Sequence, residues 1–417
     1  MATMDLTAYD AVLKDYYTEE KIKEQSYYEN PLLAMMPRKR AGGRRYIQAV
    51  EFGNPGNASA NFVDAMTNAS RSKYDDFVIT RKKQYQRVLV DHELLLSSEK
   101  PDEAFQPAFD EFDRGYRSLG EKLARRMFRT SGGTIGKLTT VTAAECPLED
   151  KADAFNFQID QVVQFATAVS GGSLRASGAT LTVTNINREE GKITFSAAPN
   201  TLSGVSANDF VVPKGDYDQC LNGVEDWLPV TDRSTKLSSA FNGVTRNVDV
   251  DRLGGIYLDG TTLGGIDEIL IKLIGKIGKH GGRTSHVFMN PESMTDLQLL
   301  MHGRSMVCTD IYTRVKSDGG QMLDIGFPGF RVNVGGMQVR IYGDRNCPSN
   351  RIYALQMNTW RFWHSGELFG FLGEKFTGKI LKLAENEDSL EGRVGTYCNI
   401  GCSAPGWNGV ASIPVAA

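Results

Sequence analysis

An amphipathic run from Pro101 to Thr130 constrains the fold of this chain more than any other stretch. Its apolar residues recur every three or four positions, at Phe105, Phe109, Phe112, Tyr116, Leu119, Leu123 and Met127. This spacing places them on one stripe of a helix. Acidic residues crowd the first half of the run and basic residues the second half, as the helix macrodipole favours. Such a helix is roughly 40 Å long, so we expect a rigid spine with a sheet or another element packed along one side.

The composition indicates a folded protein of two or three domains. The 417 residues are too many for one typical core. A net charge of -3 gives no overall attraction to nucleic acid or to a membrane surface. No apolar run reaches the ~20 residues that cross a bilayer, and the first ten residues lack the features of a signal peptide. The 6 scattered cysteines favour reduced thiols over a disulfide framework.

The residues before the spine are predicted to form an arm and a hairpin. Thr18 is a suitable N-cap for a short helix that ends at Asn30-Pro31. A small apolar patch with Leu32 and Leu33 follows, and the sequence leaves open whether the arm packs on its own domain or on a neighbouring subunit.

The hairpin has strand-like patterns over Arg45 to Phe52 and over Asp76 to Val90, separated by turn formers at Gly53 to Asn57. Neither face of the second strand is apolar enough to be buried in a monomer, and an isolated two-stranded ribbon is marginally stable. We therefore expect another chain to hold this ribbon. Its many basic residues are interspersed with acidic ones and lack a stacking platform, which favours an ion-pairing face over a nucleic-acid site.

After the spine, glycine-rich turns separate short β patterns, and a mixed α/β region follows. Four strands are predicted, at Val162 to Val169, Thr180 to Ile186, Lys192 to Ser196 and Asp209 to Val212. They indicate a small inserted all-β subdomain. From Asp232 onward the pattern predicts a helix at Leu263 to Lys279, a buried strand at His286 to Met289, a helix at Glu292 to His302, and then mostly strands.

No motif in the chain predicts a catalytic, cofactor or metal site. The five histidines form no HExxH pair and no zinc-spaced cluster, so structural roles are expected for them. Cys398 and Cys402 lack the CxxC spacing, and we expect two reduced thiols. The stretch Gly132 to Leu138 lacks the spacing of a phosphate loop. Neither a nucleophile elbow nor a dinucleotide fingerprint is present.

The order of these parts resembles the tailed-bacteriophage major capsid protein family, whose fold is called Hong Kong 97-like. The similar stretches are Tyr17 to Arg38 (arm entry), Arg44 to Val90 (E-loop), Pro101 to Thr130 (P-domain spine helix), Val287 to Pro291 with its flanking helices (A-domain), and Asp388 to Pro405 (closing P-domain strands). The resemblance covers nearly the whole chain except about Ala166 to Pro229, and no single motif is diagnostic.

The resemblance implies an α+β fold, to which the strand and turn pattern adds the inserted all-β subdomain. The implied divisions are an N-terminal arm at 1–40, an E-loop at 41–97, a P-domain spine helix at 98–130, an A-domain at 131–345 with the all-β insertion at 166–229, and P-domain return strands at 346–417.

The implied function is structural and not enzymatic. Copies of the chain would form hexamers and pentamers of an icosahedral head around the double-stranded DNA of a tailed phage. The implied partners are further copies of the chain, portal and scaffolding proteins, a decoration protein, and packaged DNA by weak non-specific contact, with no membrane. The implied location is the virion, assembled in the host bacterial cytoplasm. No cleaved N-terminal segment is expected.

The resemblance also assigns roles to particular residues. Intersubunit contacts are expected from Arg44, Arg45, Arg81, Lys83, Arg87, Leu32 and Leu33. Hinges are expected at Gly42, Gly43, Ser97 and Ser98. Some family members crosslink an E-loop lysine to a neighbour's asparagine, for which Lys73 and Asn358 are candidates, but we expect non-covalent locking here. We also expect that neutralising Arg81, Lys83 and Arg87 together weakens capsomers and leaves the monomer fold intact.

Three alternatives stay open. An encapsulin-type compartment has the same fold but packages enzymes; a cargo-peptide groove near the arm and smaller shells would favour it. A β-rich binding or decoration protein would use the insertion, but leaves the spine and ribbon unexplained. A hydrolase lacks a paired nucleophile and base. The insertion itself is expected to face outward, where it stabilises neighbours, binds a decoration protein or only fills space.

Overall fold

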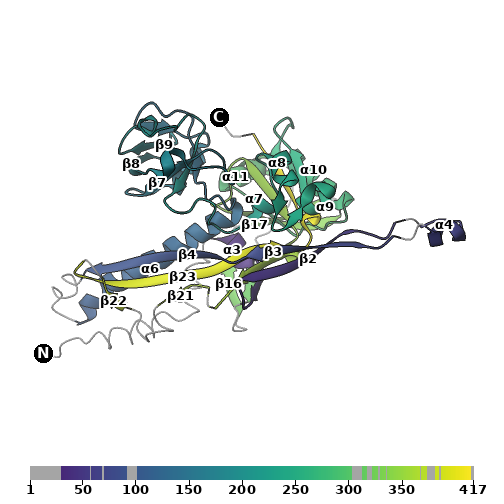
Figure 1. Cartoon of the computed structure of the whole chain (residues 1–417), viewed down its shortest axis with the longest axis horizontal. Helices are drawn as coiled ribbons and strands as arrows, with labels where there is room; N and C mark the ends of the chain where they lie inside the picture. Colours follow the sequence, from purple (N-terminus) through teal and green to yellow (C-terminus); the bar gives the residue numbers. More distant parts are fainter. Residues whose placement is uncertain are drawn as a thin grey trace.

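The computed structural model describes residues 30–56, 58–67, 70–91, 101–302, 312–316, 322–326, 329–334, 336–366, 368–372, 381–384 and 387–414. It describes the backbone alone at 91, 101–110, 301–302, 312–316, 322–326, 330 and 381. The molecule is elongated, with a long helix and a long sheet side by side, two compact units next to them, and a ribbon that projects from one end (Figure 1). The predicted arm helix at 18–28 lies outside the described residues.

The spine helix is α6 (Pro101–Phe128), with 28 residues. The predicted apolar stripe is confirmed where side chains are described, because Phe112, Tyr116, Leu119, Leu123 and Met127 are all fully buried. Phe105 and Phe109 lie outside the described side chains. The helix ends two residues before the predicted limit, and Gly133 takes a positive φ of 69° in the turn that follows. The spine therefore forms as its periodicity predicts.

The long sheet that packs on the spine is built on β23 (Ser389–Cys402). Its path runs β1 (Arg38–Arg40), β20 (Trp360–His364), β23 and β21 (Gly370–Phe371), while β22 (Leu381–Leu383) and β4 (Lys82–Asp91) also pair with β23. Strand β4 pairs antiparallel with β23 over ten residues, from Lys82 opposite Cys398 to Asp91 opposite Ser389. A Cβ on Gly115 of α6 would lie 2.5 Å from Val88 of β4, so a glycine lets the helix approach the sheet closely.

The ribbon consists of β2 (Arg45–Gly53) and β3 (Lys73–Thr80), with the short helix α4 (Phe62–Thr67) near its tip (Figure 1). One long second strand over 76–90 was predicted, and this is wrong. The chain breaks at Arg81, whose N–H donates to Arg44 O at 3.1 Å, and β3 and β4 then join different sheets. The prediction that neither face can be buried in a monomer is also wrong, because Phe77 and Ile79 are fully buried.

The α/β unit contains a mixed sheet in the order β13 (Ile256–Asp259), β24 (Gly409–Ser412), β19 (Arg351–Leu355), β14 (His286–Met289), β18 (Met337–Gly343), β17 (Gly329–Val334). Helices α10 (Ile266–Lys279) and α11 (Pro291–His302) agree closely with the predicted helices. Strands β19 and β24 lie within the predicted P-domain return segment but pair in this sheet. The return segment therefore contributes to both sheets, which corrects the single assignment of 346–417.

The inserted β subdomain has its own sheet and its own apolar core. The strand order is β5 (Gly136–Lys137), β10 (Phe210–Pro213), β7 (Val162–Ala166), β8 (Leu181–Asn187), β9 (Lys192–Phe195), β6 (Glu145–Pro147). The four predicted strands correspond to β7, β8, β9 and β10. The sheet starts at Gly136, directly after the spine, and its last strand ends at Pro213, so the predicted bounds of 166–229 are shifted toward the C-terminus.

The remaining elements are short and connect these units. They are α3 (Pro31–Met35), α7 (Val224–Trp227), α8 (Arg233–Ser238), α9 (Val250–Gly254), β11 (Ala240–Phe241), β12 (Val244–Thr245), β15 (Tyr312–Lys316), β16 (Met322–Gly326) and the 3-10 turns at Lys151–Asn156, Arg175–Gly178, Pro199–Thr201, Arg246–Val248, Met357–Thr359 and Pro405–Trp407. No helix in the described part of the chain is long and apolar enough to cross a membrane.

Candidate assembly surface

The tip of the ribbon exposes apolar side chains that its own chain does not cover. Helix α4 has no buried residue. Phe62, Val63 and Met66 are 78%, 66% and 67% exposed. Asn61 Oδ1 accepts the Val63 N–H at 3.0 Å, which holds the start of the helix. The tip is therefore a locally formed apolar surface, located far from the main core (Figure 1).

The root of the ribbon is, in contrast, fixed to the body by aromatic contacts. The Tyr46 ring stacks on Trp363 with centroids 5.2 Å apart, and Phe77 meets Trp227 edge-on at 4.8 Å. Arg252 also donates to the carbonyl of Phe52 at 2.7 Å. These contacts fix the direction of the ribbon and leave its outer half, from Gly53 to Lys73, beyond the main body (Figure 1).

The predicted basic contact residues occupy two different places. Arg44 and Arg45 are exposed where β2 begins. Lys83 and Arg87 lie on β4 in the long sheet, and Arg81 lies at the break between β3 and β4, so these three are not on the projecting ribbon. This corrects their assignment to the loop, and their role between subunits stays a prediction.

Two of these basic residues already have partners within the chain. Arg87 Nε lies 2.6 Å from an oxygen of Glu391, a carboxylate that Arg393 also contacts. Arg81 donates to Ser365 Oγ at 3.2 Å and lies over the Tyr397 ring, 5.4 Å from its centroid. Lys83 is exposed. Of these three residues, Lys83 is therefore best placed for a neighbouring chain.

The two predicted arm contacts are buried in their own chain. Leu32 and Leu33 of α3 are 0% and 1% exposed and belong to the main apolar core. Buried Asp344 accepts the Leu32 N–H at 3.3 Å, and burial raises the pKa of Asp344 to about 6. The sequence left open whether the arm packs on its own domain or on a neighbouring subunit. Leu32 and Leu33 pack on their own chain, so we do not propose them as intersubunit contacts.

The predicted hinge at Gly42 and Gly43 connects β1 to the ribbon. Both residues are exposed, and Gly43 has a φ of 97°, which favours glycine. Ser97 and Ser98 lie outside the described residues. The crosslink candidates Lys73 and Asn358 are both exposed. Non-covalent locking and the hinge both stay predictions.

The cysteines fit the predicted reduced thiols. Cys146, Cys220, Cys347, Cys398 and Cys402 are free and buried, and Cys308 lies outside the described residues. Burial raises the pKa of Cys398 and Cys402 to about 12, so both stay protonated at neutral pH. In the described part of the chain, no group of three or more His, Cys, Asp or Glu residues could hold a metal ion.

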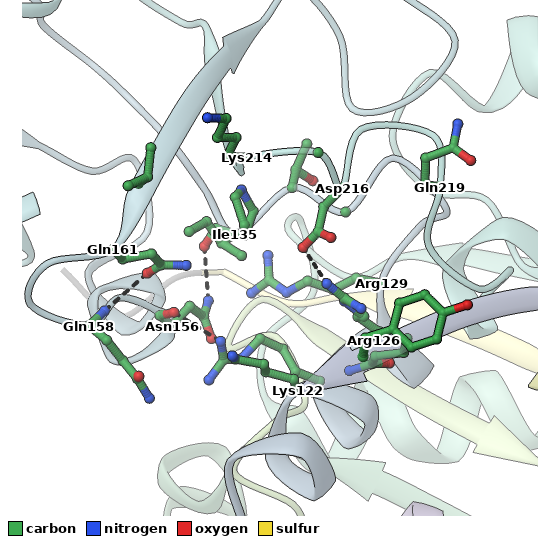
Figure 2. Close-up of a pocket in the computed structure, with 18 of the residues that line it drawn as sticks. Lys122, Arg126, Arg129, Ile135, Asn156, Gln158, Gln161, Lys214, Asp216 and Gln219 are labelled. Carbon is green, nitrogen blue, oxygen red and sulfur yellow. Dashed lines mark hydrogen bonds and ion pairs between the residues drawn. The ribbon is translucent and has the colours of Figure 1, made fainter. Parts of the chain in front are cut away.

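A basic cleft that was not predicted lies between the spine and the inserted β subdomain (Figure 2). Lys122 and Arg126 of α6 and Arg129 directly after it form one side, and Lys214 and Asp216 from the turn after β10 face them. The basic half of the spine could have indicated this cleft. Its charge was instead explained by the macrodipole, because a sequence does not show which element comes to face a helix.

The chain matches no family model and no curated protein. Among solved structures, a chain of the cyanophage A-1(L) capsid asymmetric unit is similar, with a TM-score of 0.51, 10% identity and 92% of each chain covered. A Mycobacterium phage Bobi chain matches with a TM-score of 0.44, 8% identity and complete coverage of both chains. A native GTA particle capsid chain matches with a TM-score of 0.43, 10% identity and coverage of 92% of this chain and 90% of the other.

The first of these similarities carries the conclusion on the fold, since scores below 0.5 do not establish one. The chain has a mixed helix and sheet fold similar to that of a phage capsid protein over nearly its whole length. The predicted resemblance to capsid proteins is therefore confirmed at the level of the fold. The finer division into an arm, E-loop, A-domain and P-domain stays a prediction.

Proposed function

We propose that this chain is the major capsid protein of a tailed phage, and that its copies form the hexamers and pentamers of an icosahedral head around double-stranded DNA. The observation that carries the proposal is the capsid-like fold over 92% of the chain. The spine and long sheet would be the P-domain, the α/β unit the A-domain, and the ribbon the E-loop of a Hong Kong 97-like fold.

The exposed ribbon tip supports assembly on physical grounds. Phe62, Val63 and Met66 form an apolar surface on an extension with no core beneath it. Burial of apolar area is worth about 25 cal/mol per Å², so a tip that lies on a second copy stabilises the assembly. A contact in which the tip of one copy meets the body of the next is heterologous, and it closes into a ring when the rotation between copies permits.

The proposed partners and location follow from this function. The proposed partners are a portal protein, a scaffolding protein and, on the outside of the head, a decoration protein. Packaged DNA would meet the inner surface through weak non-specific contacts, and the location would be the virion, assembled in the host bacterial cytoplasm. Arg44, Arg45, Arg81, Lys83 and Arg87 stay the proposed basic contacts, with the triple neutralisation as their test.

Negative-stain electron microscopy with static light scattering tests the proposal. Closed polyhedral shells, or rings of five and six copies, are the expected result, and the shell diameter separates a phage head from a smaller enzyme-filled compartment. A monomer or dimer at every salt and protein concentration, with and without a scaffolding partner, would contradict assembly and direct attention to the β subdomain as a ligand-binding module.

A further inference from the structure

The cleft between the spine and the β subdomain is strongly basic. Its volume is about 810 Å³, within the ~300–1,000 Å³ typical of ligand pockets. Its basic lining residues are Arg81, Lys82, Lys83, Lys122, Arg125, Arg126, Arg129 and Lys214, and its acidic lining residues are Asp160 and Asp216. Three parts of the chain supply the basic residues: β4 and the residue before it, the second half of α6 with the residue after it, and the turn after β10.

Much of this positive charge is not neutralised by a carboxylate. Lys122 Nζ bonds the amide oxygen of Gln86 at 3.0 Å, Arg125 donates to the carbonyl of Asn156 at 2.9 Å, and Lys82 Nζ donates to the carbonyl of Asp218 at 2.8 Å. These neutral acceptors leave the cations with net charge. Arg126 and Arg129, in contrast, form ion pairs with Asp216 and Asp153.

Two further observations indicate that the cleft accommodates an anion. The Arg125 Nε is buried and has no hydrogen-bond partner among the described residues. Burial, together with the like charge of Arg129, lowers the pKa of Arg125 to about 10. A like-charge cluster that is partly desolvated is destabilising when empty, and an incoming carboxylate would relieve the repulsion.

The residues at the rim of the cleft favour an acidic peptide over duplex DNA as its ligand. Ile159, Tyr85 and Val162 line it and are 62%, 53% and 37% exposed, and they lie among amide side chains such as Gln158 and Gln161. Duplex DNA presents a convex row of phosphates to a surface, and those phosphates would not cover a concave apolar rim. A peptide with both carboxylates and large apolar or aromatic side chains matches the charge and the rim together.

This chain itself contains such a peptide. Residues 1–29 hold seven acidic and three basic residues and five tyrosines. Within them, Asp15-Tyr16-Tyr17-Thr18-Glu19-Glu20 places three carboxylates and two aromatic rings in six positions. This segment precedes the described residues, and the 16 residues from Asp15 to Asn30 can extend over about 50 Å, comparable to the length of the spine.

We propose that the basic cleft is the docking site for the acidic segment 15–20 of a second copy of this chain. The proposal rests on the proposed self-assembly and names a receiving site for it. The carboxylates would meet Lys83, Lys122 and Lys214, and the tyrosines would cover Ile159 and Val162. The inserted β subdomain then has a role, because it supplies one wall of an intersubunit site.

A peptide-binding measurement tests the cleft without requiring assembly. A fluorescein-labelled peptide of residues 10–24 is titrated with dilute full-length protein, and anisotropy is recorded. The variant Lys83→Glu/Lys214→Glu reverses two exposed charges in the cleft, and Lys279→Glu/Arg283→Glu reverses two exposed charges in the α/β unit. We expect binding to weaken about tenfold or more in the cleft variant and to change less than about twofold in the control.

Competing ligands give the decisive contrast. A peptide with Asp15→Asn, Glu19→Gln and Glu20→Gln should bind about tenfold more weakly than the native peptide. Tripolyphosphate and a short DNA duplex serve as the other probes. If either of them binds in a way that depends on Lys83 and Lys214 while the native peptide does not, the proposal is overturned; the absence of any peptide binding overturns it equally.

A mixing experiment shows whether the segment comes from a second copy. One variant carries Lys83→Glu/Lys214→Glu, and another carries Glu19→Lys/Glu20→Lys. Each alone should assemble poorly, because one places two carboxylates where the carboxylates of the segment would dock, and the other places two ammonium groups against the cations of the cleft. Their mixture should recover assembly by light scattering, since each arm then finds an opposite cleft. If the mixture fails while one chain with all four substitutions assembles, the segment docks within its own copy and the intersubunit proposal is wrong.

Discussion

Strands β3 and β4 are separated in the sequence by one residue, yet β4 pairs within the long sheet of the body and β3 belongs to the projecting ribbon. Strand β4 lies in the long sheet under α6, where Val88 and Val90 are 4% and 2% exposed. The outer part of the ribbon that β3 completes has Tyr74 at 65% exposed and leads to a tip with Phe62 at 78%. The chain thus completes its own body on one side of Arg81 and leaves an unburied apolar surface on the other.

This difference separates residues that stabilise the monomer from residues available to a neighbour. A ribbon of two strands cannot bury both faces alone, and here only its root is covered, by Trp227 and Trp363. Substitutions in the body should therefore change the free energy of unfolding, whereas substitutions at the tip should change association alone.

The largest effect on association is expected from Phe62→Asp/Met66→Asp at the tip. Both side chains are exposed in the monomer, so its melting temperature should change by no more than about 2 °C. Association should fall by at least about tenfold, because charges replace apolar area in the contact. Sedimentation velocity and a thermal melt measure the two quantities, with Leu299→Asp, an exposed apolar residue on α11, as the control. Normal assembly of the tip variant would show that the tip is not a contact.

The largest effect on the free energy of unfolding is expected from Trp227→Ala at the root of the ribbon. The Trp227 ring is fully buried, meets Phe77, Phe241 and Trp360, and its N–H donates to Ile400 O at 3.2 Å. Its loss leaves a cavity and should lower the free energy of unfolding by about 3–5 kcal/mol. Urea unfolding followed by circular dichroism gives the value. A loss below about 1 kcal/mol would mean that the root is not part of the cooperative body.

A smaller effect is expected from pH acting on His286 in β14. Burial and the nearby Arg340 lower the pKa of His286 from 6.5 to about 4. As pH falls below 6.5, the unfolded chain binds this proton first, so the stabilisation present above pH 6.5 is lost toward pH 4. The loss at pH 5 is about 1–2 kcal/mol. In His286→Gln, the unfolding free energy should depend less on pH over this range; an unchanged dependence would exclude His286 as its source.

The smallest effect is expected from Arg87→Gln on β4. Arg87 is half exposed, and Arg393 still contacts Glu391 after the substitution. The free energy of unfolding should fall by about 1 kcal/mol or less. Arg114→Gln, which removes an exposed pair with Glu111 on α6, is the matched control. A clearly larger loss of unfolding free energy for Arg87→Gln would mean that this ion pair is part of the cooperative core. Neutralising Arg81, Lys83 and Arg87 together would then test folding as well as assembly.

Local periodicity predicted the parts of the fold that depend on one face of one element. The stripe of α6 and the helix-strand-helix of α10, β14 and α11 came from spacing and caps alone. The break at Arg81 could not be predicted in this way, because β3 and β4 differ in their partners and not in their pattern. Likewise, the two leucines of α3 look unpartnered in sequence and are buried only because Asp344 and the spine meet them in space.

Of the candidate site, the sequence predicted the extension but neither the residues of its tip nor the basic cleft. Turn formers and a mixed-charge ribbon indicated an extension held by another chain, but the residues of its tip were not singled out, since a six-residue apolar segment in a loop has no periodic signal. The cleft was missed because its basic residues come from elements far apart in the chain, such as Lys83 and Lys214. Only the tertiary arrangement brings them together.

Electron cryomicroscopy of the assembled particle tests most directly whether the ribbon of each copy packs on a neighbouring copy. We expect β2, β3 and α4 of each copy to lie on the surface of the adjacent copy, which covers Phe62 and Met66. A particle in which the tip remains exposed to solvent, or folds back on its own body, would contradict the assignment of the ribbon as the main intersubunit contact.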